Sequence, residues 1–127
     1  MGRKEVVMGR HTFEIELGAE KYTCRTTFEA IDAFESKANT NIITAWQSLG
    51  EGDYKFSHVA TAIWAAINGE RKLQGQKPLL WEVVGQMVQD HGFLKCLGYA
   101  SSFFSNSMPE QKSELKEDDE AEKKSTE

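Results

Sequence analysis

Cysteine and proline are scarce in this sequence, with two of each in 127 residues. Cys24 and Cys96 are far apart and show neither CxxC spacing nor a nearby pair of histidines. The usual zinc patterns, two close pairs of ligands or HExxH, are therefore missing. The sequence predicts two free thiols, no metal site and no cofactor.

Long hydrophobic runs are also missing, since no apolar stretch approaches the roughly 20 residues of a membrane helix. Residues 1–10 carry positive charge but lack the apolar run and small-residue cleavage site of a secretory signal. The formal net charge is −5 and no basic stripe recurs along a helix, which argues against nucleic-acid binding. We therefore expect a cytoplasmic protein that binds neither membranes nor nucleic acid.

Catalytic patterns are missing as well. The three histidines, His11, His58 and His91, fall at a predicted strand edge, in the first turn of a helix and at a helix end. None of them belongs to a recognisable triad of nucleophile, base and orienting group. The segment GERKLQGQK has two glycines but no closing Lys-Ser/Thr pair, so it is not a phosphate-binding loop. The sequence predicts a protein that is not an enzyme.

The segment HTFEIELGAEKYTC alternates apolar and polar residues, as a half-buried strand does. Its apolar positions are Phe13, Ile15, Leu17, Tyr22 and Cys24. The turn Gly18-Ala19-Glu20 divides the pattern into two strands, so it predicts a β-hairpin. Because a lone hairpin is marginal in water, its apolar face must pack on the segments that follow.

Capping residues and apolar spacing predict two helices after the hairpin. Thr26 and Glu29 have the spacing of a capping box, which predicts a helix over about residues 27–37. Asn41 is a suitable cap for a second, short helix that ends at the glycines of LGEGD.

Three further helices are predicted in the second half of the sequence. Ser57 is a good N-cap for the third, which we expect to end near Asn68 with Gly69 as its stop. A fourth helix is predicted over residues 80–91, after a polar loop that ends in proline. A fifth is predicted from about residue 93 to residue 104, before Ser105, Asn106 and Pro109 break it.

The last 19 residues differ in composition from the rest. Residues 109–127 hold four lysines and eight acidic residues, a net charge of −4, and no aromatic residue. Such a segment cannot bury enough apolar surface to offset its ordering entropy. We expect a disordered acidic tail, acting either as a solubilising appendage or as a binder of a basic partner. The predicted organisation is a flexible N-terminus (1–10), one globular domain (11–108) and this tail.

The fold class predicted from these elements is α+β. An N-terminal β-hairpin packs on a small bundle of four to five short helices, followed by the acidic tail. The helices carry more apolar residues than one small core needs, which indicates a partner or self-association. The residues that we expect to contact a partner are Trp64, Leu80, Trp81, Val83, Phe103 and Phe104.

The order of these elements resembles a known family. The chain has a strand pair around EIEL and KYTCRTTF, an acidic helix after Thr27 and Phe28, and a Phe-Ser helix start with an aromatic residue near IWAAI. A helix with Val84-Gly85 follows and ends at Gly92. In this order and spacing the chain is similar to the small tail assembly chaperones of long-tailed phages (siphophages) and gene transfer agents. That family is sometimes catalogued under a tail tube label.

The resemblance covers about Phe13 to Phe104. The sequence departs from the family pattern at the start of the Val-Gly helix, where Leu79 and Leu80 stand in place of a Thr or Ser cap. The long loop GERKLQGQKP is also unusual for the family.

The resemblance implies a non-enzymatic role in tail morphogenesis. Such a chaperone coats the long, helical tape-measure protein and helps to recruit tail tube subunits. It works in the host cytoplasm and is expected to be absent from the mature virion. The alternative is a structural tail tube protein or another virion tail component, which would form stable rings and need more strand content than one hairpin.

Overall fold

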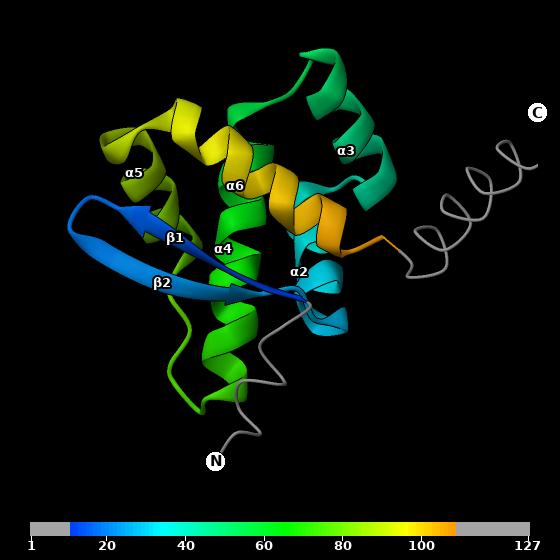
Figure 1. The fold of residues 1–127 in the computed structure, drawn as a ribbon. Helices are drawn as coiled ribbons and strands as arrows, with labels where there is room; N and C mark the ends of the chain where they lie inside the picture. Colours follow the sequence, from blue (N-terminus) through cyan, green and yellow to red (C-terminus); the bar gives the residue numbers. More distant parts are fainter. Residues whose placement is uncertain (1–10, 109–127) are drawn as a thin grey trace, which may run out of the picture.

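The computed structural model describes residues 11–108 and shows a two-stranded antiparallel hairpin followed by five helices (Figure 1). The α+β fold class is therefore confirmed. The elements follow in this order: β1 (Thr12–Leu17), β2 (Glu20–Arg25), α2 (Phe28–Ala38), α3 (Ile42–Glu51), α4 (Phe56–Leu73), α5 (Trp81–His91) and α6 (Phe93–Asn106). The flexible N-terminus predicted for residues 1–10 and the acidic tail predicted for residues 109–127 lie outside the described residues.

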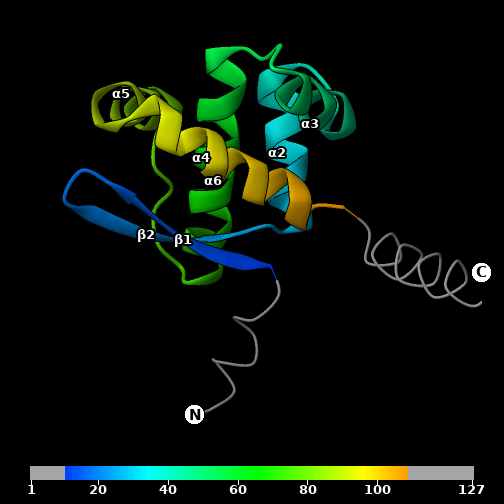
Figure 2. The same cartoon turned by 45° about the horizontal axis from the view of Figure 1, so that its top comes forward.

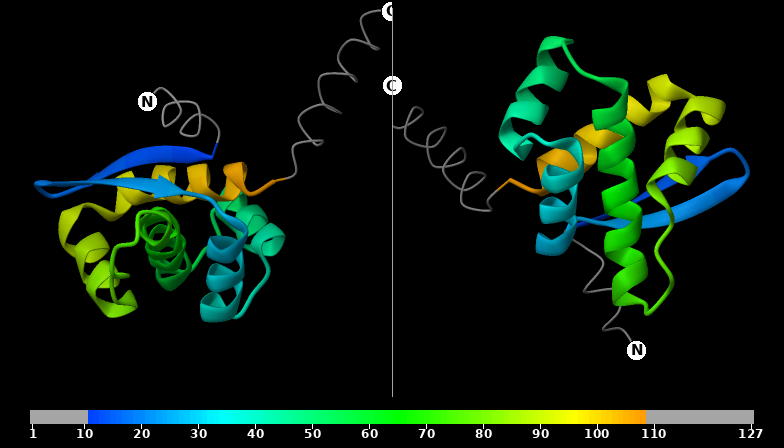
Figure 3. Two further views of the ribbon diagram at one scale, coloured as in Figure 1. Left: turned by 90° about the horizontal axis from the view of Figure 1, so that it is seen from below. Right: turned by 180° about the vertical axis from the view of Figure 1, so that it is seen from behind.

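The elements form two layers around α4. Seen from below, the hairpin and α6 make one layer, and α5, α4 and α2 make the other, with α4 in the middle (Figure 3). The helix α6 crosses α4 diagonally, and α3 packs beside α2 and α6 (Figure 2). Because α4 contacts β2, α2, α5 and α6, it is the central helix. The face that α4 shares with α2 and α5 is turned away from the hairpin.

The hairpin turn is shorter than the sequence predicted. Gly18 and Ala19 alone form it, because Glu20 already pairs with Leu17. Gly18 has a φ of 68°, a conformation that glycine adopts without steric cost. A Cβ at Gly18 would lie 2.6 Å from Cε1 of His91. The turn is therefore packed directly against the end of α5.

Tyr99 of α6 covers part of the outer edge of β1. Its hydroxyl accepts a hydrogen bond from the Glu16 amide (3.1 Å) and lies 3.4 Å from the Glu16 carbonyl oxygen, to which it donates. These two backbone groups point away from β2 and would otherwise be open to pairing with another chain. Tyr99 thus protects an edge that the hairpin itself leaves exposed.

We expect Tyr99→Phe to lower the free energy of unfolding by about 1 kcal/mol, because it removes these hydrogen bonds. The variant should also self-associate more strongly through the uncovered edge of β1. Urea denaturation and size-exclusion chromatography at several protein concentrations measure the two effects. Unchanged stability together with unchanged elution would contradict this role of Tyr99.

The first helix begins one residue later than predicted. The capping residue is Thr27, whose hydroxyl accepts a hydrogen bond from the Ala30 amide at 3.0 Å. Thr26 instead extends the hairpin ladder through its amide, which donates to the His11 carbonyl at 2.8 Å. The capping box assigned to Thr26 is therefore wrong. The cap predicted at Asn41 is confirmed, since its side chain accepts from the Thr44 amide at 2.8 Å.

The third predicted helix is longer at both ends. It spans Phe56–Leu73, so Ser57 lies inside its first turn and Lys55 takes the N-cap position without a side-chain hydrogen bond. Gly69 does not stop the helix. A Cβ there would collide with the carbonyl oxygen of Arg25 and lie 3.3 Å from Cβ of Ala30. Glycine is therefore present because α4 passes very close to the main chain of β2.

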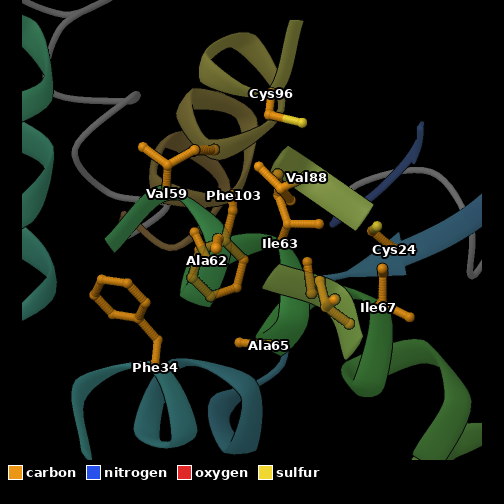
Figure 4. Close-up of a cluster of buried hydrophobic side chains, with 14 of the residues drawn as sticks. Cys24, Phe34, Val59, Ala62, Ile63, Ala65, Ile67, Val88, Cys96 and Phe103 are labelled. Carbon is orange, nitrogen blue, oxygen red and sulfur yellow. The ribbon is translucent and has the colours of Figure 1, made fainter. Parts of the chain in front are cut away.

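The core lies between the two layers and is built largely on α4 (Figure 4). The labelled side chains in that view are Cys24, Phe34, Val59, Ala62, Ile63, Ala65, Ile67, Val88, Cys96 and Phe103. Both cysteines are buried and free, which confirms the predicted free thiols. Burial raises the pKa of the Cys24 thiol, and the Glu70 carboxylate raises it further. Burial also raises the pKa of the Cys96 thiol.

An ion pair is buried where α4 meets β2. Nε of Arg25 donates to Oε1 of Glu70 at 2.8 Å, and the two side chains are only 10% and 9% exposed. The second carboxylate oxygen of Glu70 accepts from Nε2 of Gln74 at 2.7 Å. Both oxygens of the buried carboxylate are thus engaged, as burial of a charge requires.

Candidate interaction surface on α2, α4 and α5

Two shallow hollows lie along α4, one on each flank. The hollow between α4 and α5 has a volume of about 270 Å³ and is lined by Phe56, Ser57, Ala60, Trp81, Glu82, Gly85, Gln86 and Gln89. The hollow between α2 and α4 has a volume of about 180 Å³ and is lined by Thr27, Glu29, Ala30, Ala33, Trp64, Ala65, Asn68, Gly69 and Lys72. We call the surface that contains both hollows the helical face; it is turned toward the viewer in the right panel of Figure 3.

Trp81 lies across the middle of the helical face. It begins α5, and its indole Nε1 donates to the hydroxyl of Thr61 on α4 at 2.9 Å. The ammonium group of Lys37 on α2 lies 4.5 Å from the centroid of the same ring. This geometry is a cation–π contact, which attracts a cation to the ring face. One partly exposed side chain therefore links all three helices of the face.

Trp64 holds the loop before α5 in place. Its Nε1 donates to the carbonyl oxygen of Leu79 at 3.1 Å, and Nδ2 of Asn68 donates to the same oxygen at 3.0 Å. The Leu79 amide in turn donates to Oδ1 of Asn68 at 2.8 Å. Trp64 also lines the hollow between α2 and α4. The two tryptophans predicted as contact residues thus come together on the helical face, and both also have structural partners.

Leu80 and Val83 point to a different side of α5. Leu80 is 66% exposed and Val83 is 46% exposed, so both are open to solvent. Val83 is four residues before Met87, and residues at this spacing share one side of a helix. The Met87 sulfur accepts a hydrogen bond from the Tyr22 hydroxyl of the hairpin at 3.7 Å. Val83 therefore lies on the hairpin side of α5, and neither Leu80 nor Val83 lines either hollow.

Phe103 and Phe104 are not surface residues. They are 0% and 1% exposed, because α6 packs across α4 and brings both rings against Phe34 of α2. The ring centroids of Phe34 and Phe103 are 5.9 Å apart, and those of Phe34 and Phe104 are 5.3 Å apart. The prediction that these two residues contact a partner is corrected, since they belong to the core.

An aromatic cluster beside the helical face was missed from the sequence. Phe56 is 43% exposed and stacks on Phe93 with ring centroids 4.7 Å apart. Tyr54 also packs on Phe93, with ring centroids 5.9 Å apart. The signal was present in the run DYKF, which places two aromatic residues just before and at the start of α4. Phe56 also lines the α4–α5 hollow.

The N-terminus of α5 lacks a stabilising side-chain cap. Leu80 occupies the N-cap position with extended backbone angles (φ −75°, ψ 146°) and makes no side-chain cap hydrogen bond. Ser, Thr, Asn and Asp are preferred there because they accept a hydrogen bond from a free amide of the first turn. A large exposed leucine at this position stabilises neither the helix nor the core.

We expect Leu80→Ser to raise the free energy of unfolding by about 1 kcal/mol, because serine can cap α5. Thermal denaturation followed by circular dichroism measures the change. The matched control is Leu73→Ser, since Leu73 is 60% exposed at the last residue of α4 and has no capping role. Equal effects of the two substitutions would show that the cap position of Leu80 is not the cause.

Metal-ligating and titratable side chains are present across the described part of the chain. Within residues 11–108, no group of three or more His, Cys, Asp or Glu side chains could hold a metal ion. His58 packs against Phe34, and burial together with the nearby Lys55 charge lowers the pKa of its imidazole. Among the same residues no helix combines the length and apolarity needed to cross a membrane.

Comparisons with known proteins give no match to this chain. No protein-family model matches it, and neither a curated protein nor a solved structure is significantly similar.

Proposed function

We propose that this protein is a non-enzymatic tail assembly chaperone that binds helical segments of a phage tape-measure protein on its helical face. In this role it keeps the apolar stripes of the long partner from aggregating and helps to recruit tail tube subunits. It acts in the host cytoplasm, where tails assemble, and leaves before the virion is complete. The proposal combines the order of elements in the chain with the character of this face.

The observation that supports the proposal most is the pair of hollows along α4. Their linings contain the two tryptophans and several small residues, such as Ala33, Ala60 and Gly85, which leave room for side chains of a partner. A surface of this kind suits the apolar side of an amphipathic helix, which docks through residues on one helical stripe. Gly85 leaves free space at the lining of the α4–α5 hollow, since a Cβ built on it meets no atom within 4 Å.

The alternative role is a structural tail tube or other virion component. A tube is held together by rings of subunits, and we expect a ring to need more strand content than one hairpin. The described residues contain one two-stranded sheet, and Tyr99 covers part of the edge of β1. These features favour the chaperone over the tube subunit. Composition of purified tails distinguishes the two, because a tube protein would be abundant there and a chaperone missing.

Co-expression with the tape-measure protein encoded nearby tests the proposal. We expect the two proteins to co-elute from a size-exclusion column and the tape-measure protein to become soluble. Gly85→Gln should abolish both effects, because its side chain fills the α4–α5 hollow. Gly98→Gln is the matched control, since Gly98 is also a helical glycine with no atom within 4 Å of its Cβ position and lies on α6.

Two outcomes would contradict the proposal. The first is an insoluble tape-measure protein together with rings or tubes formed by this protein alone, which would favour the virion component. The second is equal loss of co-elution in Gly85→Gln and Gly98→Gln, which would place the binding surface elsewhere. Light scattering of the protein alone detects such rings or tubes.

A further inference from the structure

The net negative charge of the described residues comes from the two outer helices of the helical face, α2 and α5. Helix α2 carries three carboxylates and one lysine, and α5 carries two carboxylates and no lysine or arginine. Together they have a formal charge of −4. Residues 11–108 hold eleven acidic and eight basic residues, a net charge of −3, so the rest of the described chain is close to neutral, at +1.

The strip of α4 between these two helices is uncharged over most of its length. Ser57, Ala60, Trp64 and Asn68 follow one another along it at helical spacing and line the two hollows. The charged side chains of α4, Glu70, Arg71 and Lys72, all lie in its last turn, and Glu70 is buried against Arg25. Lys72 pairs with Glu29 at 3.0 Å. The strip of α4 is thus flanked by two helices of net negative charge, which we call the acidic walls. On α2, Glu29 is paired with Lys72 and Glu35 accepts from the Ile42 amide at 2.8 Å, so the α5 wall, with Glu82 and Asp90, carries more of the open negative charge.

From this distribution we infer that the segment bound on the helical face is a basic amphipathic helix. The apolar stripe of this helix lies along α4. Its lysines and arginines lie on both sides of the stripe and face α2 and α5. This inference rests on the proposed function, because it specifies which part of the partner the same face selects. Lys37 shows that the ring face of Trp81 accepts a cation, since its ammonium lies 4.5 Å from the ring centroid. The face therefore holds a cation against its central indole.

The same charge distribution disfavours two other occupants of the helical face, the chain's own C-terminal segment and a second copy of the protein. The chain's own segment 109–127 has a net charge of −4, so the acidic walls repel it. It also has only one large aliphatic residue and therefore no apolar stripe to place on α4. A second copy docked face to face would bring α2 and α5 against equally acidic helices. Like charges set against each other across an interface disfavour that pairing. Charge complementarity therefore favours a basic partner.

The positions of the hollows also set the spacing of the partner's apolar residues. Ala60 lines the α4–α5 hollow and Asn68 lines the α2–α4 hollow. Eight residues of α-helix separate them, a rise of about 12 Å. The hollows lie on opposite flanks of α4, so the partner crosses it obliquely. Two large apolar side chains seven or eight residues apart on the partner, a rise of about 11–12 Å, match this axial separation.

Two designed peptides test the inference without the tape-measure protein. Both are labelled 22-residue helices with the same apolar stripe, including leucines seven residues apart. The positions on both sides of the stripe are lysine and arginine in one peptide and glutamate in the other. Fluorescence anisotropy against the full chain measures their affinities at low and high salt. We expect the basic peptide to bind at least tenfold more tightly at low salt and to lose most of this advantage at 0.5 M salt.

Charge-reversed variants locate the effect on the walls. The double variant Glu82→Lys/Asp90→Lys reverses the α5 wall and should abolish the preference for the basic peptide. The matched control, Glu14→Lys/Glu20→Lys, makes the same change in net charge on the hairpin and should keep the preference. Equal affinities of the two peptides for the wild-type protein, equal effects of the two double variants, or no binding of either peptide would overturn the inference.

The same variants separate this inference from the proposed function. If the tape-measure protein co-elutes with wild type and with Glu82→Lys/Asp90→Lys equally well, the chaperone role stands and the basic-helix inference fails. If it does not co-elute with wild type, the chaperone role itself fails, whatever the peptides show. Co-elution that is lost only in the α5 variant supports both.

Discussion

Gly69→Ala is expected to lower the free energy of unfolding by about 3 kcal/mol, although alanine is the better helix former by about 1 kcal/mol. The added methyl group would collide with the carbonyl oxygen of Arg25 and crowd Cβ of Ala30 at 3.3 Å. Because the obstacle is the main chain of β2, it cannot rotate away as a side chain would. Either β2 moves off α4 or α4 bends. Urea denaturation followed by circular dichroism measures the loss.

The same chain supplies controls for Gly69→Ala. Gly50 and Gly98 are also helical, and a Cβ at either position meets no atom within 4 Å. Alanine at these two positions should raise the free energy of unfolding by up to about 1 kcal/mol, through helix propensity alone. If Gly69→Ala were as stable as Gly98→Ala, the close approach of α4 to β2 would not be a constraint on this fold.

The contrast at Gly69 shows which parts of the fold could be predicted from the sequence. The hairpin and the five helices were predictable because alternation and helical spacing are local patterns. The ends of the helices were less predictable from the sequence. Gly69 resembles a helix stop locally, and only the distant carbonyl of Arg25 explains it. Thr26 resembles a cap, but its amide is already used by the hairpin ladder through His11. Both errors arise where tertiary contacts outweigh local preference.

The candidate surface was predictable in part for a similar reason. Apolar spacing showed that the helices had more hydrophobic residues than a small core needs, and Leu80 and Val83 are indeed exposed. The pattern could not show which elements cover each stripe. Phe103 and Phe104 are covered because α6 packs against α2 and α4, an arrangement that no local pattern encodes. Nor could it show that Trp81 crosses α4 to reach Thr61.

Glu70→Gln is expected to lower the free energy of unfolding by about 4 kcal/mol. The substitution removes the negative charge beside the Arg25 guanidinium while keeping nearly the same volume, so packing is not the main cause. Both side chains are at most 10% exposed, so water cannot replace the lost counter-charge well. Because Arg25 ends β2 and Glu70 lies on α4, the loss falls on the contact between the two layers. Chemical denaturation at neutral pH measures it.

Two comparisons decide whether burial of the charge is the cause. The exposed pair Lys72–Glu29 has a similar separation, 3.0 Å, but its side chains are 69% and 65% exposed. Glu29→Gln should therefore cost under about 1 kcal/mol, because solvent screens exposed pairs. The double variant Arg25→Met/Glu70→Met should recover most of the loss, since it buries no charge. A loss from Glu70→Gln no larger than that from Glu29→Gln would mean that the ion pair positions α4 on β2 without stabilising their contact.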